Sequence, residues 1–175
     1  MRFRSALKLV PRILRGEENA GIAAIEFAIF ATVFVIILAG TVDIGFAIYT
    51  ASQLDTAVSA GAQYAENNAA MVSSNPSSLS TDISTVVNDV LGTGWATSTV
   101  NVNNGNDATG CYCPTGSPPS WSWGSSKTCG ASCTGSGVAG QFVIITASRN
   151  ISPMFPAFGF VQNGAISRSA VLETQ

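Results

Sequence analysis

One apolar run limits what this chain can fold into more than any other feature of the sequence. Between Ile22 and Tyr49 the only formal charges are Glu26 and Asp43, and the sixteen residues between these two are uncharged and mostly bulky. At about 1.5 Å per helical residue, Ile22 to Asp43 covers roughly 32 Å, close to the hydrocarbon thickness of a bilayer. This length predicts a membrane-spanning helix from which Asp43 emerges at the far interface.

The charges that flank the run predict its orientation. Five of the eight basic residues precede it, namely Arg2, Arg4, Lys8, Arg12 and Arg15. Under the positive-inside rule, this bias places the N-terminus in the cytoplasm and the rest of the chain outside it. The rest of the chain has no basic stripe that could neutralise phosphates, so the sequence predicts no nucleic-acid partner.

Other kinds of apolar segment fit less well. A secretory signal peptide has a shorter apolar region that ends in a small-x-small site, and no Cys follows this run, as a lipoprotein would require. An ordinary single-pass anchor fits the length and the flanking charges but does not account for Glu26. A carboxylate costs about 2.5–3.5 kcal/mol at the centre of a spanning helix and less near an interface, so Glu26 is a candidate functional residue.

The segment around Glu26 resembles a known family. Gly21 and Glu26 lie in G-I-A-A-I-E-F-A, which is similar to the cleavage site of type IV prepilins and pseudopilins. A narrower resemblance is to the TadE-like proteins of the tight-adherence (Tad, Flp) pilus system. It is carried by this segment, by the later V-D-I-G-F-A, by the Ala-rich stretch that follows, and by a C-terminal end that contains P-M-F-P.

This resemblance implies a function and the residues that serve it. A prepilin peptidase would cut after Gly21, so that residues 1–21 form a cytoplasmic leader and Ile22 becomes the mature N-terminus. Glu26, followed by Phe27, would act in helix–helix assembly by pairing with the Ile22 ammonium of a neighbouring subunit. The implied partners are the inner membrane, the prepilin peptidase, other pilin or pseudopilin subunits and the pilus assembly platform, and the protein would enter the pilus or stay in the membrane.

The sequence predicts an α+β fold. We expect a transmembrane helix at 22–48, a periplasmic extension of that helix at 49–72 and a small periplasmic domain at 79–175. The extension carries an apolar stripe that we expect to pack on this domain; the stripe consists of Ile48, Ala51, Leu54, Ala57, Val58 and Ala62.

A second, shorter helix and three strands are predicted within the domain. After a polar break at 73–78, Ser80 or Thr81 can cap the helix and Gly92 can end it. Its apolar stripe consists of Ile83, Val86, Val87, Val90 and Leu91. Strands at 97–103, 141–148 and 165–173 would form a small antiparallel sheet, with the last strand at an edge.

Four cysteines lie in a Gly- and Ser-rich insertion at 104–137. They are Cys111, Cys113, Cys129 and Cys133, spaced C-x-C, fifteen residues, C-x3-C. The usual zinc spacings are C-x2-C or C-x4-C, whereas disulfides suit a domain outside the cytoplasm, so disulfides are favoured over a metal. Because the C-x-C pair would close a very tight ring, we expect pairs that cross the insertion: Cys111 with Cys129 and Cys113 with Cys133, or the swapped pairing.

No catalytic residue, cofactor or metal site is predicted. The chain has no His, which removes the common His-containing nucleophile and zinc systems, and only Asp82, Asp89 and Asp107 cluster even loosely. The hypothesis is therefore a non-enzymatic pilus subunit. The alternative is an uncleaved, membrane-anchored envelope protein whose periplasmic domain binds a ligand or a surface.

Aromatic residues outside the apolar run are interpreted as packing residues. Trp121 and Trp123 could bind a sugar, a lipid headgroup or another subunit, but a small core within the insertion is favoured. We expect Phe155, Phe158 and Phe160 to cover the edge of the sheet.

Overall fold

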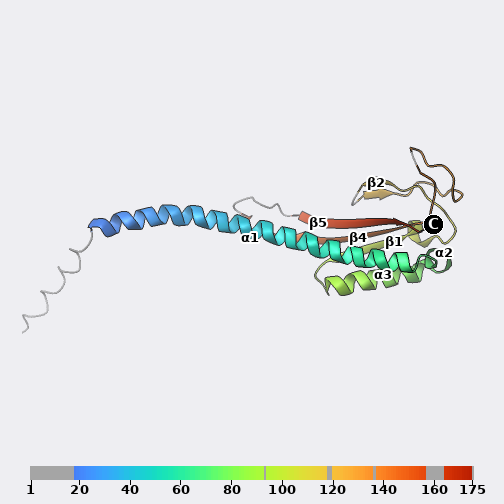
Figure 1. Cartoon of the computed structure of the whole chain (residues 1–175), viewed down its shortest axis with the longest axis horizontal. Coiled ribbons are helices and arrows are strands. Elements are labelled where there is room, and N and C mark those ends of the chain that lie inside the picture. Colours follow the sequence, from blue (N-terminus) through green and yellow to red (C-terminus); the bar gives the residue numbers. More distant parts are fainter. Residues whose placement is uncertain (1–17, 93, 118–119, 136, 157–163, 175) are drawn as a thin grey trace, which may run out of the picture.

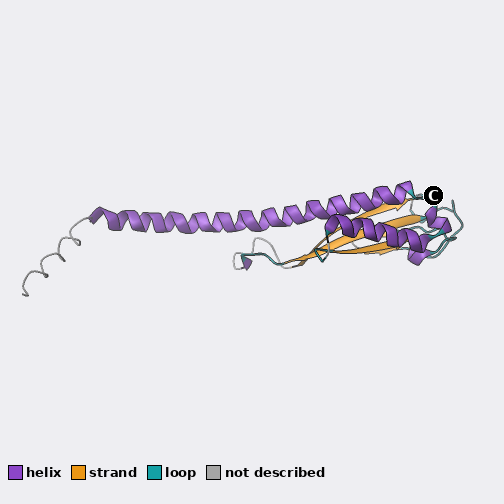
Figure 2. Ribbon diagram, turned by 90° about the horizontal axis from the view of Figure 1, so that it is seen from below, coloured by secondary structure: helices purple, strands orange, loops and turns teal. Residues whose placement is uncertain are grey.

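The structure is a computed structural model that describes residues 18–174 except 93, 118–119, 136 and 157–163. One helix, α1 (Glu18–Asn67), is 50 residues long and dominates the molecule. Its C-terminal part packs on the α+β domain, whereas its N-terminal part extends well beyond that domain (Figures 1 and 2). The predicted basic leader lies largely outside the described residues.

The end of α1 differs from the prediction. The helix ends at Asn67 rather than near residue 72, and the chain turns at Asn68, whose side-chain amide donates a hydrogen bond to the carbonyl of Tyr64 at 2.9 Å. The turn leads into a short helix, α2 (Met71–Ser74), and the next helix begins at Pro76, so Asn75 is the one residue of the predicted polar break at 73–78 that is not helical.

The second long helix, α3 (Pro76–Leu91), begins earlier than predicted. Its N-cap is Asn75, whose side chain accepts a hydrogen bond from the backbone N–H of Ser78, and Pro76 suits the first helical position. The predicted N-caps, Ser80 or Thr81, were therefore wrong. Ser80 instead lies within the helix, where its hydroxyl donates to the carbonyl of Val100 at 3.3 Å.

The C-terminal end and the buried face of α3 largely follow the prediction. Gly92, with a φ of 78°, ends the helix as expected, since glycine tolerates this left-handed backbone. The face toward the core comprises Leu79, Ile83, Val87 and Leu91, whereas Val90, a member of the predicted stripe, is 40% exposed.

Three antiparallel strands form the main sheet in the order β1-β4-β5, which confirms the α+β class. Their bounds are β1 (Thr97–Val102), β4 (Phe142–Ile151) and β5 (Gly164–Glu173). The register pairs Val102 with Val143 and Ile145 with Ala170. The central strand is the most apolar, and β5 lies at an edge, as its polar residues predict.

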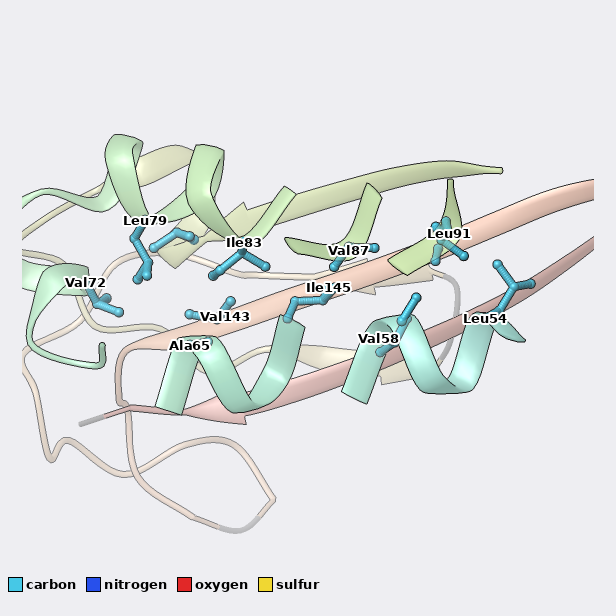
Figure 3. Packing of buried hydrophobic residues seen from close by; sticks show 13 residues of the cluster. Leu54, Val58, Ala65, Val72, Leu79, Ile83, Val87, Leu91, Val143 and Ile145 are labelled. Atoms are coloured by element: carbon cyan, nitrogen blue, oxygen red, sulfur yellow. The ribbon is translucent and has the colours of Figure 1, made fainter. Parts of the chain in front are cut away.

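The core lies between one face of this sheet and the two helices α1 and α3 (Figure 3). Because side chains of a strand alternate between faces, β4 directs Val143, Ile145 and Ala147 to the helices. On α1 the close approach occurs at Gly61. A Cβ placed there would lie 2.6 Å from Cγ2 of Val87 and 3.3 Å from Cδ1 of Ile145, so glycine sets the distance between the layers.

The Cys-rich insertion lies between β1 and β4. It begins with α4 (Asn103–Asn106), a left-handed turn in which Asn104 has a φ of 53° and Gly105 a φ of 86°. Asn and Gly tolerate this conformation better than other residues. A small hairpin of β2 (Thr115–Ser117) and β3 (Ser120–Ser122) follows, which the sequence did not predict.

Candidate functional site

The N-terminal half of α1 is the first candidate site, because it exposes large apolar side chains on all sides. Phe27 and Phe30 are each 74% exposed, and the exposed apolar residues continue to Ile48 and Tyr49, which are 65% and 56% exposed. Among the described residues, α1 is the one helix long and apolar enough to cross a membrane. A helix that is apolar all round needs an apolar environment, either a bilayer or other helices.

The residues predicted for cleavage and assembly all lie on this helix. Gly21 and Ile22 fall within its first turns, and Glu26 follows one turn later with an exposed side chain. In the part of the chain that the structure describes, Glu26 has no salt-bridge or hydrogen-bond partner.

A shallow apolar groove of about 570 Å³ runs along α1 between Ile36 and Ile48. Gly40, Thr41 and Gly45 form its small-residue floor. Small residues of this kind allow helix backbones to approach closely in membranes. The groove is therefore suited to a second helix.

Beside this groove, α1 carries a feature that the sequence did not predict. Asp43 was expected to emerge at the membrane interface, but its side chain is buried, with 3% exposed. Its two carboxylate oxygens accept hydrogen bonds from the backbone N–H groups of Met154 at 2.9 Å and Phe155 at 3.2 Å. These bonds tie the segment after β4 to α1.

The face that Asp43 shares with the core explains this contact. Asp43, Thr50, Leu54 and Ala57 are buried and follow one another at intervals of seven, four and three residues, which places them on one side of the helix. The domain therefore covers this one face, and the segment at Met154 extends the cover toward the apolar half of α1.

Part of α1 is similar to a known protein family. A family model described as TadE-like protein matches residues 21–63, beginning at Gly21. Residues 21–63 are TadE-like. The resemblance that the sequence indicated is thus confirmed for this segment, which includes Glu26 and Asp43. Neither the curated proteins nor the solved structures provide a match.

The cysteines lie outside the TadE-like segment and form two disulfides. Cys111 pairs with Cys129 and Cys113 with Cys133, with Cα–Cα distances of 5.0 and 5.8 Å. This is one of the two pairings across the insertion that the sequence left open. Because the bonds close loops with sequence separations of 18 and 20 residues, each contributes about 3 kcal/mol in the chain-entropy model.

Asp107 organises the start of the insertion. Its Oδ1 accepts hydrogen bonds from the backbone N–H groups of Thr109 and Gly110, and its Oδ2 accepts one from the hydroxyl of Tyr112 at 2.7 Å. These bonds lower the pKa of Asp107 to about 2. The N–H of Thr109 has the largest effect, followed by the hydroxyl of Tyr112 and the N–H of Gly110. Asp82, by contrast, accepts a bond from Tyr64 on α1, so these two carboxylates hold separate parts of the domain.

The two indoles of the insertion lie over the outer face of the sheet. Trp123 packs edge-to-face on Tyr112 with ring centroids 5.8 Å apart. Together with Trp121 it borders a cavity of about 180 Å³ whose other walls are Thr99, Asn101, Ile144 and Thr146. Trp123 therefore packs within the insertion, as expected, and both indoles also share a cavity with the sheet.

Two further predictions concern clusters of residues. No group of three or more His, Cys, Asp or Glu side chains that could hold a metal ion occurs within the described ranges. Of the three phenylalanines expected at the sheet edge, Phe155 is described and is 38% exposed beside Asp43, whereas Phe158 and Phe160 lie outside the described residues.

Proposed function

We propose that the protein is a minor pilin or pseudopilin that takes part in assembly of a tight-adherence type IV pilus. It would sit in the bacterial inner membrane with its N-terminus in the cytoplasm and its domain in the periplasm. The observation that carries this proposal is the exposed apolar half of α1 with Glu26 near its start, a carboxylate that has no partner among the described residues. The TadE-like match, which begins at the Gly of the cleavage motif, supports it.

The association surface would be a stripe that contains Glu26. From Glu26 the spacing of three and four residues continues through Phe30, Val33, Ile37, Gly40, Ile44 and Ile48. Four members of this stripe border the groove on α1: Ile37, Gly40, Ile44 and Ile48. A neighbouring helix seated along the groove would therefore also pass Glu26.

The charge at Glu26 gives this association its specificity. Cleavage after Gly21 creates an ammonium at Ile22, one helical turn before Glu26. Both charges are costly in lipid, so a Glu26 carboxylate that meets the Ile22 ammonium of a neighbour removes two unpaired charges at once. A prepilin peptidase and the pilus assembly platform would be the further partners.

Cleavage is tested by the N-terminal mass of the membrane-extracted protein. In a strain with its prepilin peptidase we expect the chain to begin at Ile22, and in a strain without the peptidase at Met1. A Gly21→Leu variant should also remain uncleaved, because the bulky side chain replaces the small residue at the cut. Intact Met1 in the peptidase-positive strain would refute the processing step.

The role of Glu26 is tested with variants that separate charge from shape. Glu26→Gln keeps the size and removes the charge, so we expect normal membrane insertion and loss of pilus assembly. Glu66→Gln, at the exposed end of the same helix, is the matched control and should assemble normally. Normal piliation of the Glu26→Gln strain would overturn the assembly mechanism while leaving the membrane anchor intact.

We further propose that the protein is not an enzyme. Asp82 and Asp107, which cluster loosely in the sequence, each serve a structural contact of their own, with Tyr64 and with Thr109 to Tyr112. One observation favours the alternative of a surface-binding envelope protein, namely the cavity beside Trp121 and Trp123. Under that alternative the chain stays uncleaved, so the N-terminal mass distinguishes the two.

A further inference from the structure

The buried carboxylate of Asp43 lies at an unusual depth relative to the membrane. If the bilayer surrounds the apolar part of α1, Ile22 to Tyr49 spans about 40 Å, which equals the hydrocarbon core plus much of the interfacial regions. Asp43 is then two turns inside the periplasmic limit of the apolar surface, where Ile44 and Ile48 are still 46% and 65% exposed. The segment tied to Asp43 shares that level.

The tied segment is apolar and faces outward. Met154 is 69% exposed and Phe155 38% exposed, although the backbone N–H groups of both are held by Asp43. No Asp, Glu, Lys or Arg occurs between Asn150 and Ser167. Exposed Met and Phe side chains at this level would meet lipid rather than water, and transfer of their apolar surface out of water is favourable.

The residues just beyond this segment suit the polar side of an interface. The guanidinium of Arg149 lies 4.1 Å from the ring centroid of Trp95 and 5.2 Å from that of Phe46. Aromatic rings and a cation with a long apolar stem are typical of the headgroup region. The order along the molecule is thus apolar side chains, then aromatic rings with Arg149, then the polar domain.

We propose that Met154 and Phe155 form a second membrane contact, inserted at the boundary of headgroups and acyl chains, and that Asp43 positions it. The inference rests on the membrane anchorage in the proposed function. The domain would then touch the bilayer at two points, the helix and this segment, which limits its tilt relative to the membrane. Asp43 is a positioning residue, because it acts through the backbone of Met154 and Phe155.

Depth-dependent fluorescence quenching tests the proposal. The full chain, with its disulfides intact, is placed in phosphatidylcholine–phosphatidylglycerol vesicles and labelled with an environment-sensitive fluorophore at one added cysteine. Met154→Cys is the test position, Val33→Cys reports on the span, and Val138→Cys, directly after the insertion and 50% exposed, reports on water. We expect shallow spin-labelled lipids to quench the label at 154, deep ones to quench it at 33, and neither to quench it at 138.

The possible outcomes separate this inference from the anchor itself. Absence of quenching at 33 would overturn the anchor. Quenching at 33 with the label at 154 as accessible to water as that at 138 would overturn the inference alone. A blue-shifted but unquenched label at 154 that reverts when the protein is diluted in lipid would mean that another subunit covers the segment, and would also overturn it.

The positioning role of Asp43 has its own readout. In Asp43→Ala carrying the label at 154, we expect loss of the shallow quenching, because the two N–H groups lose their acceptor. The label at 33 in the same variant should be quenched as before. Unchanged quenching at 154 would refute the positioning role and leave the membrane contact in place.

Discussion

At the scale of single residues, the carboxylates of this protein differ in their hydrogen-bond partners. Glu26 is exposed and unpaired among the described residues, whereas Asp43 and Asp107 each accept hydrogen bonds from two backbone N–H groups. Bonds to a charged acceptor are stronger than neutral ones. The two bonded carboxylates therefore fix loops that have little regular structure of their own.

The lowered pKa of Asp107 predicts a pH-dependent contribution to stability. Its pKa is about 2 in the folded protein and 3.8 ordinarily, so the folded state binds the proton less readily than the unfolded state. The contribution is complete above about pH 4 and is lost as the pH falls through about 2. We expect Asp107→Asn to lower the free energy of unfolding at neutral pH, with the difference from wild type shrinking between pH 4 and pH 2.

Chemical denaturation followed by circular dichroism at several pH values measures this difference. Asp89→Asn, an exposed aspartate on α3, controls for the loss of a surface charge. A difference for Asp107→Asn that stays constant down to pH 2 would show that the charged hydrogen bonds contribute nothing.

At the scale of elements, the contact of α1 with α3 and β4 depends on a glycine in a helix. Glycine in a helix interior costs about 0.5–1 kcal/mol relative to alanine, so its presence needs a structural reason. The reason is the short distance to Val87 and Ile145 at Gly61. Gly45, on the same helix, has open space around its Cβ position.

This contrast predicts different effects on stability for the same change, glycine to alanine, at these two positions. Gly61→Ala should lower the thermal unfolding temperature, because overpacking costs about 1–3 kcal/mol and exceeds the gain in helix propensity. Gly45→Ala is the matched control and should leave that temperature unchanged or raise it. Detergent-solubilised protein scanned by circular dichroism gives both values, and equal stabilisation by the two variants would contradict the close approach at Gly61.

At the scale of the whole molecule, the protein consists of the exposed apolar half of α1 and a domain that packs on one face of this helix. The domain covers the face of α1 that contains Asp43 and Leu54. The Cys-rich insertion lies at the end of the domain away from the apolar half of α1 (Figure 1). The disulfides stabilise that distant end, where polar composition alone could not support a core.

Loss of a disulfide should therefore lower the stability of the domain without affecting the membrane anchorage by α1. Replacing Cys113 and Cys133 together by Ser is expected to lower the free energy of unfolding by about 3 kcal/mol, because the unfolded chain regains the entropy of the open loop. Membrane extraction of the variant should match that of wild type. An unchanged unfolding temperature under oxidising conditions would show that the insertion folds without this bond.

The local parts of the structure followed from the sequence. The three strands of the main sheet were predicted to within a few residues, because alternation and apolar runs are local signals. The start of α3 was missed by several residues, since the cap at Asn75 precedes the apolar stripe from which the helix was inferred. Of the candidate site, the exposed apolar helix with Glu26 was predicted, whereas the role of Asp43 was not.

The sequence by itself determined the long apolar helix, the α+β class, the TadE-like N-terminal segment and the set of cysteines available for pairing. Only the tertiary structure decided which cysteines pair, that the indoles lie over the outer face of the sheet, and that Asp43 binds the segment after β4. The physical reason is distance along the chain. Asp43 and Met154 are 111 residues apart, and a single hydrogen bond across that separation leaves no periodic pattern in the sequence.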